Sequence, residues 1–135
     1  KIAGTVHRAF AGRGWEGVEF LGLVDDLAAL YTKSGVVISP LTFGSGLKIK
    51  LVEALAQGKA VIATSVTLQG VEDICRDAVI QTDDATIFAD ALVDLASSSS
   101  ARTDLAQRAL ACAQRNFSPY TTHRELRKWC EKARA

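Results

Sequence analysis

The stretch that decides the fold runs from residue 39 to residue 64 and reads SPLTFGSGLKIKLVEALAQGKAVIAT. It leaves an apolar run at Val36–Ser39, turns through two glycines and enters an amphipathic segment, Gly46–Gln57, that stops at Gly58. A second apolar run, Ala60–Thr64, follows. Short apolar runs of this kind are typical of strands buried on both faces, and a helix between two of them indicates a parallel pair.

The rest of the chain extends this alternation of strands and helices. Because strands alternate with helices, we predict an α/β fold in a single domain of residues 1–135, with a Rossmann-like parallel sheet of about five strands flanked by helices. The other expected strands are Lys1–Gly4, Val18–Gly22 and Ala78–Thr82, and the other expected helices are Leu27–Lys33, Ala85–Ala96, Ala101–Asn116 and Pro119–Arg134.

Composition excludes several classes of function. The 135 residues are 48% hydrophobic and carry a net charge of +1, so nothing indicates a nucleic-acid partner. Cys75, Cys112 and Cys130 lack metal-ligand spacing, so we expect no metal and a reduced, cytoplasmic setting, in which each cysteine is a small buried hydrophobe or a bystander. The longest apolar runs are too short to span a bilayer.

The glycine-rich loop is the candidate ligand site. In open α/β sheets, ligands bind outside the carboxyl ends of the strands, which is where Gly44, Ser45, Gly46 and Leu47 are expected. Glycine lets the backbone approach a ligand closely, and the following helix start offers N–H groups suited to phosphate. The loop is not a Walker motif, because no Gly-Lys-Ser/Thr closes it.

A polar stripe continues from this loop along the expected helix. Lys50, Glu53 and Gln57 share one face, and Lys48 lies in the first turn. A solvated helix face with one Lys–Glu pair explains the stripe equally well. The alternative is a nucleotide site, in which a cation meets phosphate and a carboxylate accepts sugar hydroxyls.

Residues 44–64 resemble the donor-binding, carboxyl-terminal half of group-1 glycosyltransferases (family 4, GT-B fold). The family pattern is a glycine loop, a basic residue, Lys, then Glu-Ala three residues on, then Gly-x-Pro-Val-Val-Ala-Thr. The chain has Ala60 where that pattern has Pro. The resemblance is specific in the middle and weaker toward residues 1 and 115.

The resemblance implies hexosyltransferase-like transfer from a nucleotide diphosphate-sugar with retention, in carbohydrate biosynthesis, without a metal or other cofactor. Glu53 would bind the ribose, and Lys50, Lys48 and the amides of residues 44–47 would hold the diphosphate. The backbone at Leu23 and Val24 would meet the base. Many relatives carry a second Glu eight positions before Glu53, where this chain has Ser45. The alternative is therefore a non-catalytic interaction or nucleotide-binding module with a degenerate donor site.

The resemblance also implies that parts of the enzyme lie outside this chain. These are the amino-terminal domain, which would bind an unidentified acceptor, and a first strand at the sheet centre. We expect the gap between Lys1–Gly4 and Val36–Ser39 to be closed directly, by another chain or by an upstream segment. The isolated chain would be inactive, and the helix near 119–134, with Trp129, would pack on the missing domain. The full-length protein would be cytoplasmic or peripheral to the inner face of a membrane.

The remaining motifs do not indicate a binding or catalytic site. Residues 12–17 match the pattern GxGxxG but precede a strand, whereas dinucleotide binding requires the pattern after one, so we interpret them as a turn. His7 could touch a donor, although a bystander role is the simpler interpretation, and His123 has no assigned role. Trp15, Phe43 and Trp129 are expected to pack in a core or interface, with stacking on a base as the alternative.

Overall fold

The computed structural model describes residues 1–10 and 14–133 and divides the chain into two compact units, residues 1–30 and 31–135. The boundary falls within one helix, α1 (Leu27–Lys33). The amide of Ala29 donates to Asp26 Oδ1 at 2.9 Å, so the Asp26 side chain caps this helix.

The first unit is a small parallel pair of strands with an aromatic cluster. Strands β1 (Ile2–Ala3) and β2 (Phe20–Gly22) pair in parallel, and a 3-10 helix, η1 (Thr5–Phe10), follows β1. The ring of Phe10 stacks on Phe20 at 5.7 Å and meets Trp15 edge-on at 6.5 Å. Positions 12 and 13 of the GxGxxG match lie outside the described residues.

The second unit contains a three-stranded parallel sheet in the order β3 (Val36–Ser39), β4 (Ala60–Ala63), β5 (Ile80–Gln81). Every residue of the central strand is buried, because helices cover both of its faces. Val61 and Ala63 point into one apolar cluster, and Ala60 and Ile62 point into the other.

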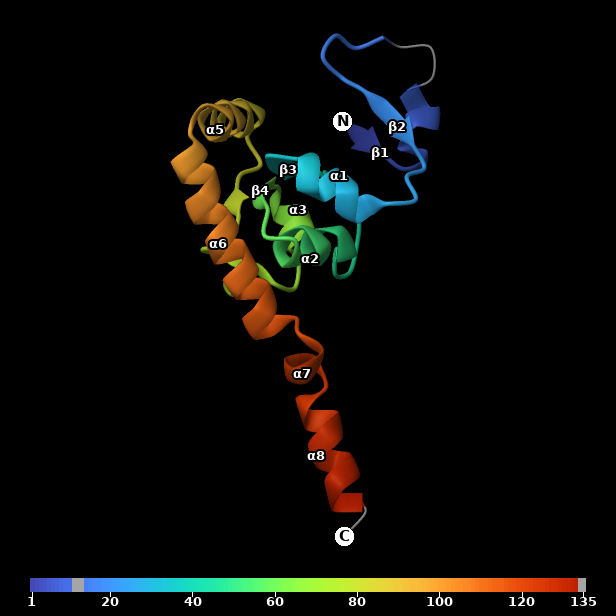
Figure 1. The fold of residues 1–135 in the computed structure, drawn as a ribbon, viewed down its shortest axis with the longest axis vertical. Coiled ribbons are helices and arrows are strands. Elements are labelled where there is room, and N and C mark those ends of the chain that lie inside the picture. The colour runs from blue at the N-terminus through green and yellow to red at the C-terminus, as the bar shows by residue number, and fades with distance from the viewer. Residues whose placement is uncertain (11–13, 134–135) are drawn as a thin grey trace. The chain divides into compact units, whose positions relative to one another are not determined.

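Helices on both faces complete this unit (Figure 1). Leu51 and Leu55 bring α2 onto one face, where part of α6 also packs. Leu95 and Leu105, from α5 and the beginning of α6, cover the other face. The helices are α2 (Ile49–Ala56), α3 (Ser65–Leu68), α4 (Glu72–Cys75), α5 (Ala85–Ser97) and α6 (Ser99–Asn116).

The α/β class and the parallel strands flanked by helices of a Rossmann-like fold are confirmed. Among the described residues, the first unit holds the sheet β1–β2 and the second unit holds the sheet β3–β4–β5, where a single sheet was expected. How the gap between Lys1–Gly4 and Val36–Ser39 is closed stays a prediction. Short apolar runs indicate that a segment is a strand, but they leave open which strand it pairs with, so sequence pattern alone did not divide the sheets.

The expected helix Pro119–Arg134 is interrupted. The structure has α7 (Pro119–Thr122), then His123, then α8 (Arg124–Ala133). The Thr121 hydroxyl donates to the Arg115 carbonyl and the Thr122 hydroxyl to the Ser118 carbonyl, both at 3.0 Å. Such local bonds compete with regular helix hydrogen bonding, which explains the break.

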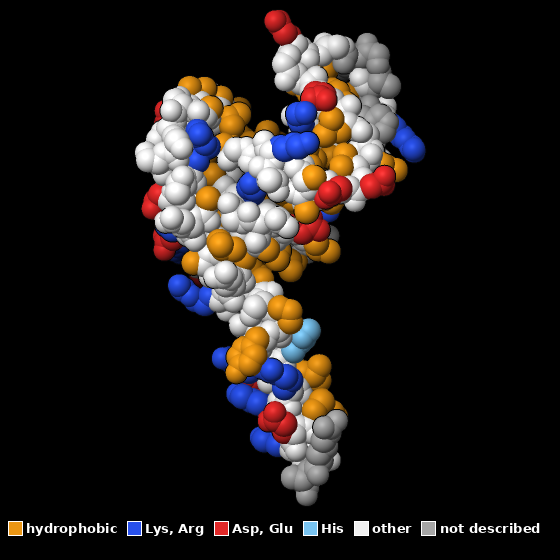
Figure 2. All heavy atoms as spheres, in the orientation of Figure 1, with side chains coloured by type: hydrophobic (Ala, Val, Ile, Leu, Met, Phe, Trp, Pro, Cys, Tyr) orange, Lys and Arg blue, Asp and Glu red, His pale blue; other side chains and the backbone are white. Residues whose placement is uncertain are grey.

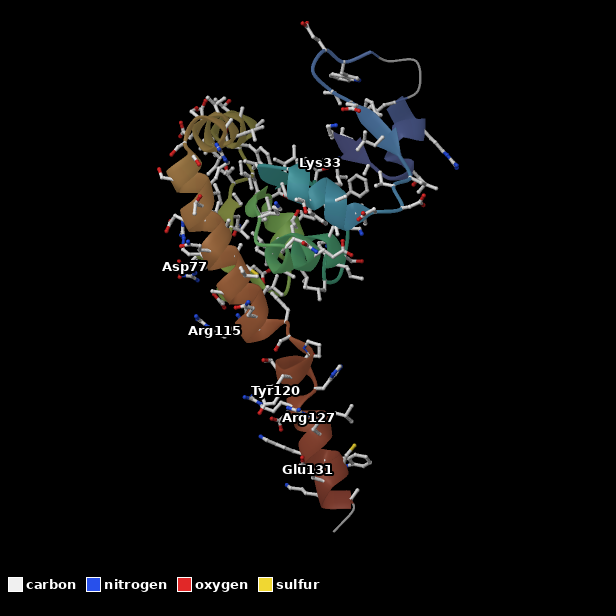
Figure 3. The ribbon with its side chains drawn as sticks, viewed as in Figure 1. Lys33, Asp77, Arg115, Tyr120, Arg127 and Glu131 are labelled. Carbon is white, nitrogen blue, oxygen red and sulfur yellow. The ribbon has the colours of Figure 1, made fainter. Side chains whose placement is uncertain are left out.

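Helix α8 is amphipathic, and its described residues are exposed. The Arg127 guanidinium lies 4.1 Å from the centre of the Tyr120 ring, beside an open groove of about 650 Å³ that Leu126 and Cys130 also line (Figure 3). Trp129 is 67% exposed, so its side chain is not packed in a core of this chain, and its predicted contact with a missing domain stays a prediction. Figure 2 shows apolar, basic and acidic side chains side by side on this segment.

Candidate functional site

The glycine-rich loop leaves the carboxyl end of β3 and leads into α2, as the sequence predicts. Gly44 has φ 134° and Gly46 has φ 71°, so both adopt a backbone conformation that side chains disfavour. Gly44, Ser45, Gly46 and Leu47 are all exposed, which leaves the loop accessible to a ligand.

Helix α2 begins at Ile49, three residues later than Gly46, where the sequence predicted its start. The reason is conformational, because Gly46 is left-handed and Lys48 is extended, with φ −85° and ψ 95°. The Lys48 ammonium bends back and donates to the Gly46 carbonyl at 2.8 Å. Lys48 therefore braces the loop in this structure, and its predicted contact with a diphosphate stays a prediction.

Lys50 and Glu53 lie one turn apart on α2, directly after the loop. Lys50 Nζ donates to Glu53 Oε2 at 2.8 Å, with the Lys side chain 70% exposed and the Glu side chain 37% exposed. This hydrogen bond is the main reason why the pKa of Lys50 is raised above its ordinary value. The pair places a carboxylate beside a cation on α2. The first turn of α2 contains no acidic residue that would repel an anionic ligand.

Tyr31 is a site residue that sequence reasoning missed. It lies on α1, packs partly against the same apolar cluster as Leu51 and Leu55, and reaches Glu53. Burial raises the pKa of Tyr31, and the nearby Glu53 carboxylate raises it further through its charge and a side-chain hydrogen bond. A lone Tyr, 22 positions before the Glu, gives no local signal, because only the packing of Tyr31 against the apolar cluster that includes Leu51 and Leu55 brings the two together.

The remaining predicted donor residues belong to the first unit. Leu23 and Val24 follow β2, with Leu23 73% exposed and Val24 half-buried. Their predicted contact with a base stays a prediction. Phe43, in the loop, is 85% exposed, so core packing within this chain is excluded for it. The side chain of His7 lies outside the described part of the structure.

Two of the three cysteines are small buried residues, as the sequence predicts. Cys75 and Cys112 are buried thiols and Cys130 is exposed, with no disulfide between them. Burial, helped by the charge of Cys112 and a hydrogen bond to it, raises the pKa of Cys75 to about 12. Cys75 is therefore a protonated core residue and not a nucleophile. Among the described residues, no group of three or more His, Cys, Asp or Glu is arranged to hold a metal ion.

The sequence of this chain is similar to known proteins. Residues 2–98 match the sequence profile of a family described as "Glycosyl transferases group 1". A curated relative, an uncharacterized 44.6 kDa protein in the cps region of Klebsiella pneumoniae, is 24% identical over 93 residues. The match covers 69% of this chain and 24% of that protein, so the chain spans about a quarter of the relative's length.

Proposed function

This chain belongs to the group 1 glycosyltransferases, and we propose that it is the half that binds a nucleotide diphosphate-sugar donor for a retaining transferase. The observation that carries the proposal is the Lys50–Glu53 pair, held at 2.8 Å on α2 directly behind a loop with two left-handed glycines. Open α/β sheets bind their ligands at this end of their strands.

Each part of the site has a chemical role in this proposal. The Glu53 carboxylate accepts hydrogen bonds from the two ribose hydroxyls, and contact with Tyr31 keeps it at the surface of the core. Lys50 uses one of its three N–H donors on Glu53 and directs the others toward the diphosphate. The amides of residues 44–47 add donors as negative charge grows on the leaving diphosphate.

Sugar transfer needs groups that this half does not supply. The acceptor and the groups that orient it belong, in our proposal, to an amino-terminal domain of a longer cytoplasmic protein, and α8 packs against that domain. The exposed apolar residues Tyr120, Leu126 and Trp129 support this part of the proposal. Within the described residues, no helix is long and apolar enough to cross a membrane.

Ser45 favours a second candidate function. It occupies the loop position at which many relatives carry a sugar-contacting Glu, and a serine hydroxyl supplies neither that charge nor that reach. A non-catalytic module that binds a nucleotide or a protein, with a degenerate donor site, accounts for this substitution.

Calorimetric titration of the 135-residue chain separates the two candidates. We expect saturable binding of at least one nucleoside diphosphate from a panel of bases, with weaker binding of the matching nucleoside and of pyrophosphate. Nucleotide sugars should then compete with that diphosphate for one site. Absence of binding across the panel, with a cooperative thermal melt that shows a folded chain, would refute a donor site and favour the interaction module.

A further inference from the structure

Two buried threonines are hydrogen-bonded to Ser39 and Leu41, in the segment that leads from β3 into the glycine-rich loop. Thr64 follows β4 and is 8% exposed, and Thr67, on α3, is 0% exposed. The Thr64 hydroxyl donates to the Leu41 carbonyl at 2.6 Å. The Thr67 hydroxyl donates to the Ser39 carbonyl at 2.9 Å and lies 3.0 Å from the Ser39 hydroxyl. The bend that leaves β3 is therefore hydrogen-bonded at Ser39 and at Leu41 to threonine hydroxyls from the segment that follows β4.

The bonding of Thr64 departs from what its position favours. Thr64 is the N-cap residue of α3, where a threonine hydroxyl ordinarily accepts a hydrogen bond from a helix amide. Here the Thr64 side chain caps no amide. Asp83 Oδ1 accepts from the Ser65 amide, the first of α3, at 2.8 Å. The Thr64 hydroxyl accepts from no helix amide, and it donates to the Leu41 carbonyl.

Further hydrogen bonds connect this clamp, by which we mean Thr64 and Thr67 with their partners Ser39 and Leu41. The Thr64 amide donates to the Ser39 carbonyl at 3.2 Å, and the two threonine hydroxyls lie 3.3 Å apart. Among the described residues, no buried side-chain oxygen or nitrogen lacks a partner. Buried polar networks that are fully satisfied fix one geometry, because any displacement leaves a polar atom unpaired.

We propose that Thr64, supported by Thr67, is a positioning residue that fixes the loop at Leu41 so that the amides of residues 44–47 present one geometry to a diphosphate. Leu41 lies three residues before Gly44, so a displaced Leu41 carbonyl moves the loop that follows. Loop amides are useful for transfer only when they are already oriented toward the developing charge. This inference rests on the proposed function and deepens it.

The test compares Thr64→Val, which removes the hydroxyl and keeps the shape, with Thr64→Ser, which keeps the hydroxyl. The loss of one hydrogen bond should weaken binding of the nucleoside diphosphate about three- to tenfold in Thr64→Val. Binding of the nucleoside should stay close to that of the parent, because Glu53 is on α2, and Thr64→Ser should restore diphosphate binding. Thr86→Val is the matched control, since Thr86 is exposed on α5, across the sheet from α2.

Hydrogen exchange supplies a readout that needs no ligand. In Thr64→Val the amides of residues 42–47 should exchange about tenfold faster, while those of β4 keep their protection. Thr67→Val is the second variant, expected to change both readouts in the same direction, in case Thr64→Val does not fold. Unchanged exchange and binding, or equal losses of nucleoside and diphosphate, would overturn the clamp. If the parent binds no diphosphate, the proposed function fails. The exchange data alone then test whether the Thr64 hydroxyl holds residues 42–47 in place.

Discussion

Replacing Lys50 by Ala tests whether Lys50 binds a ligand or is only part of a solvated helix face. The Lys50 ammonium lies 2.8 Å from Glu53 Oε2 and its side chain is 70% exposed, so the pair adds only about 0.2–0.5 kcal/mol to stability. A charge-assisted hydrogen bond to a diphosphate is worth about 1.5–3 kcal/mol, which is about 10- to 150-fold in affinity. Lys50→Ala should therefore bind diphosphates much more weakly and melt almost like the parent.

Glu53→Ala should give the opposite pattern. This variant loses the acceptor for the ribose hydroxyls, so nucleoside and nucleoside diphosphate should both bind more weakly. Pyrophosphate, which has no ribose, should bind almost as it does to the parent. Calorimetric titration of both variants with a nucleoside, its diphosphate and pyrophosphate, together with thermal melts, measures the contrast.

Lys128→Ala is the matched control for Lys50→Ala. Lys128 forms the same kind of pair on α8, with its ammonium 3.0 Å from Glu125 Oε1 and its side chain 59% exposed. Its removal should change neither stability nor nucleotide binding appreciably. If Lys50→Ala and Glu53→Ala bind all three ligands as the parent and Lys128→Ala do, the site assignment is refuted.

Four further outcomes follow from the structure. The isolated chain should transfer no sugar from any nucleotide sugar, because it lacks acceptor positioning, and turnover by the pure chain would contradict this. Hydrogen bonds from the Ser65 side chain and amide lower the pKa of Asp83. The charged carboxylate therefore stabilises the fold above its unfolded pKa of about 3.9, and this stabilisation is lost as pH falls through the lower pKa of the folded state. In Asp83→Asn the melting temperature should therefore fall less steeply than in the parent as pH is lowered through this range. A chromogenic disulfide reagent at pH 8 should titrate Cys130 quickly, and should reach Cys75 and Cys112 only after unfolding, whereas three fast thiols would disprove their burial. Trp129→Ala should change the stability of this chain by less than about 0.5 kcal/mol, since its side chain is exposed, and a larger loss in denaturant titrations would place Trp129 in the core.

The local elements and their class follow from patterns in the sequence. Apolar runs such as Ala60–Ala63 became buried strands, and the periodicity of residues 85–116 became two helices, joined through Ser98. These patterns are readable because helix and strand periods depend on neighbours a few residues apart. The loop between β3 and α2 was readable for the same reason, since its glycines and lysines are adjacent in the chain.

Only the tertiary structure decided which distant groups meet. It placed Tyr31 against Glu53, and set the Thr64 hydroxyl on the Leu41 carbonyl, across 23 positions of sequence. It also divided the five strands between two sheets. Strand pairing and side-chain contact depend on how helices pack over the whole core. Hydrophobic periods of 2 or 3.6 residues carry no information on contacts between distant segments, so these features could not be predicted from the sequence pattern.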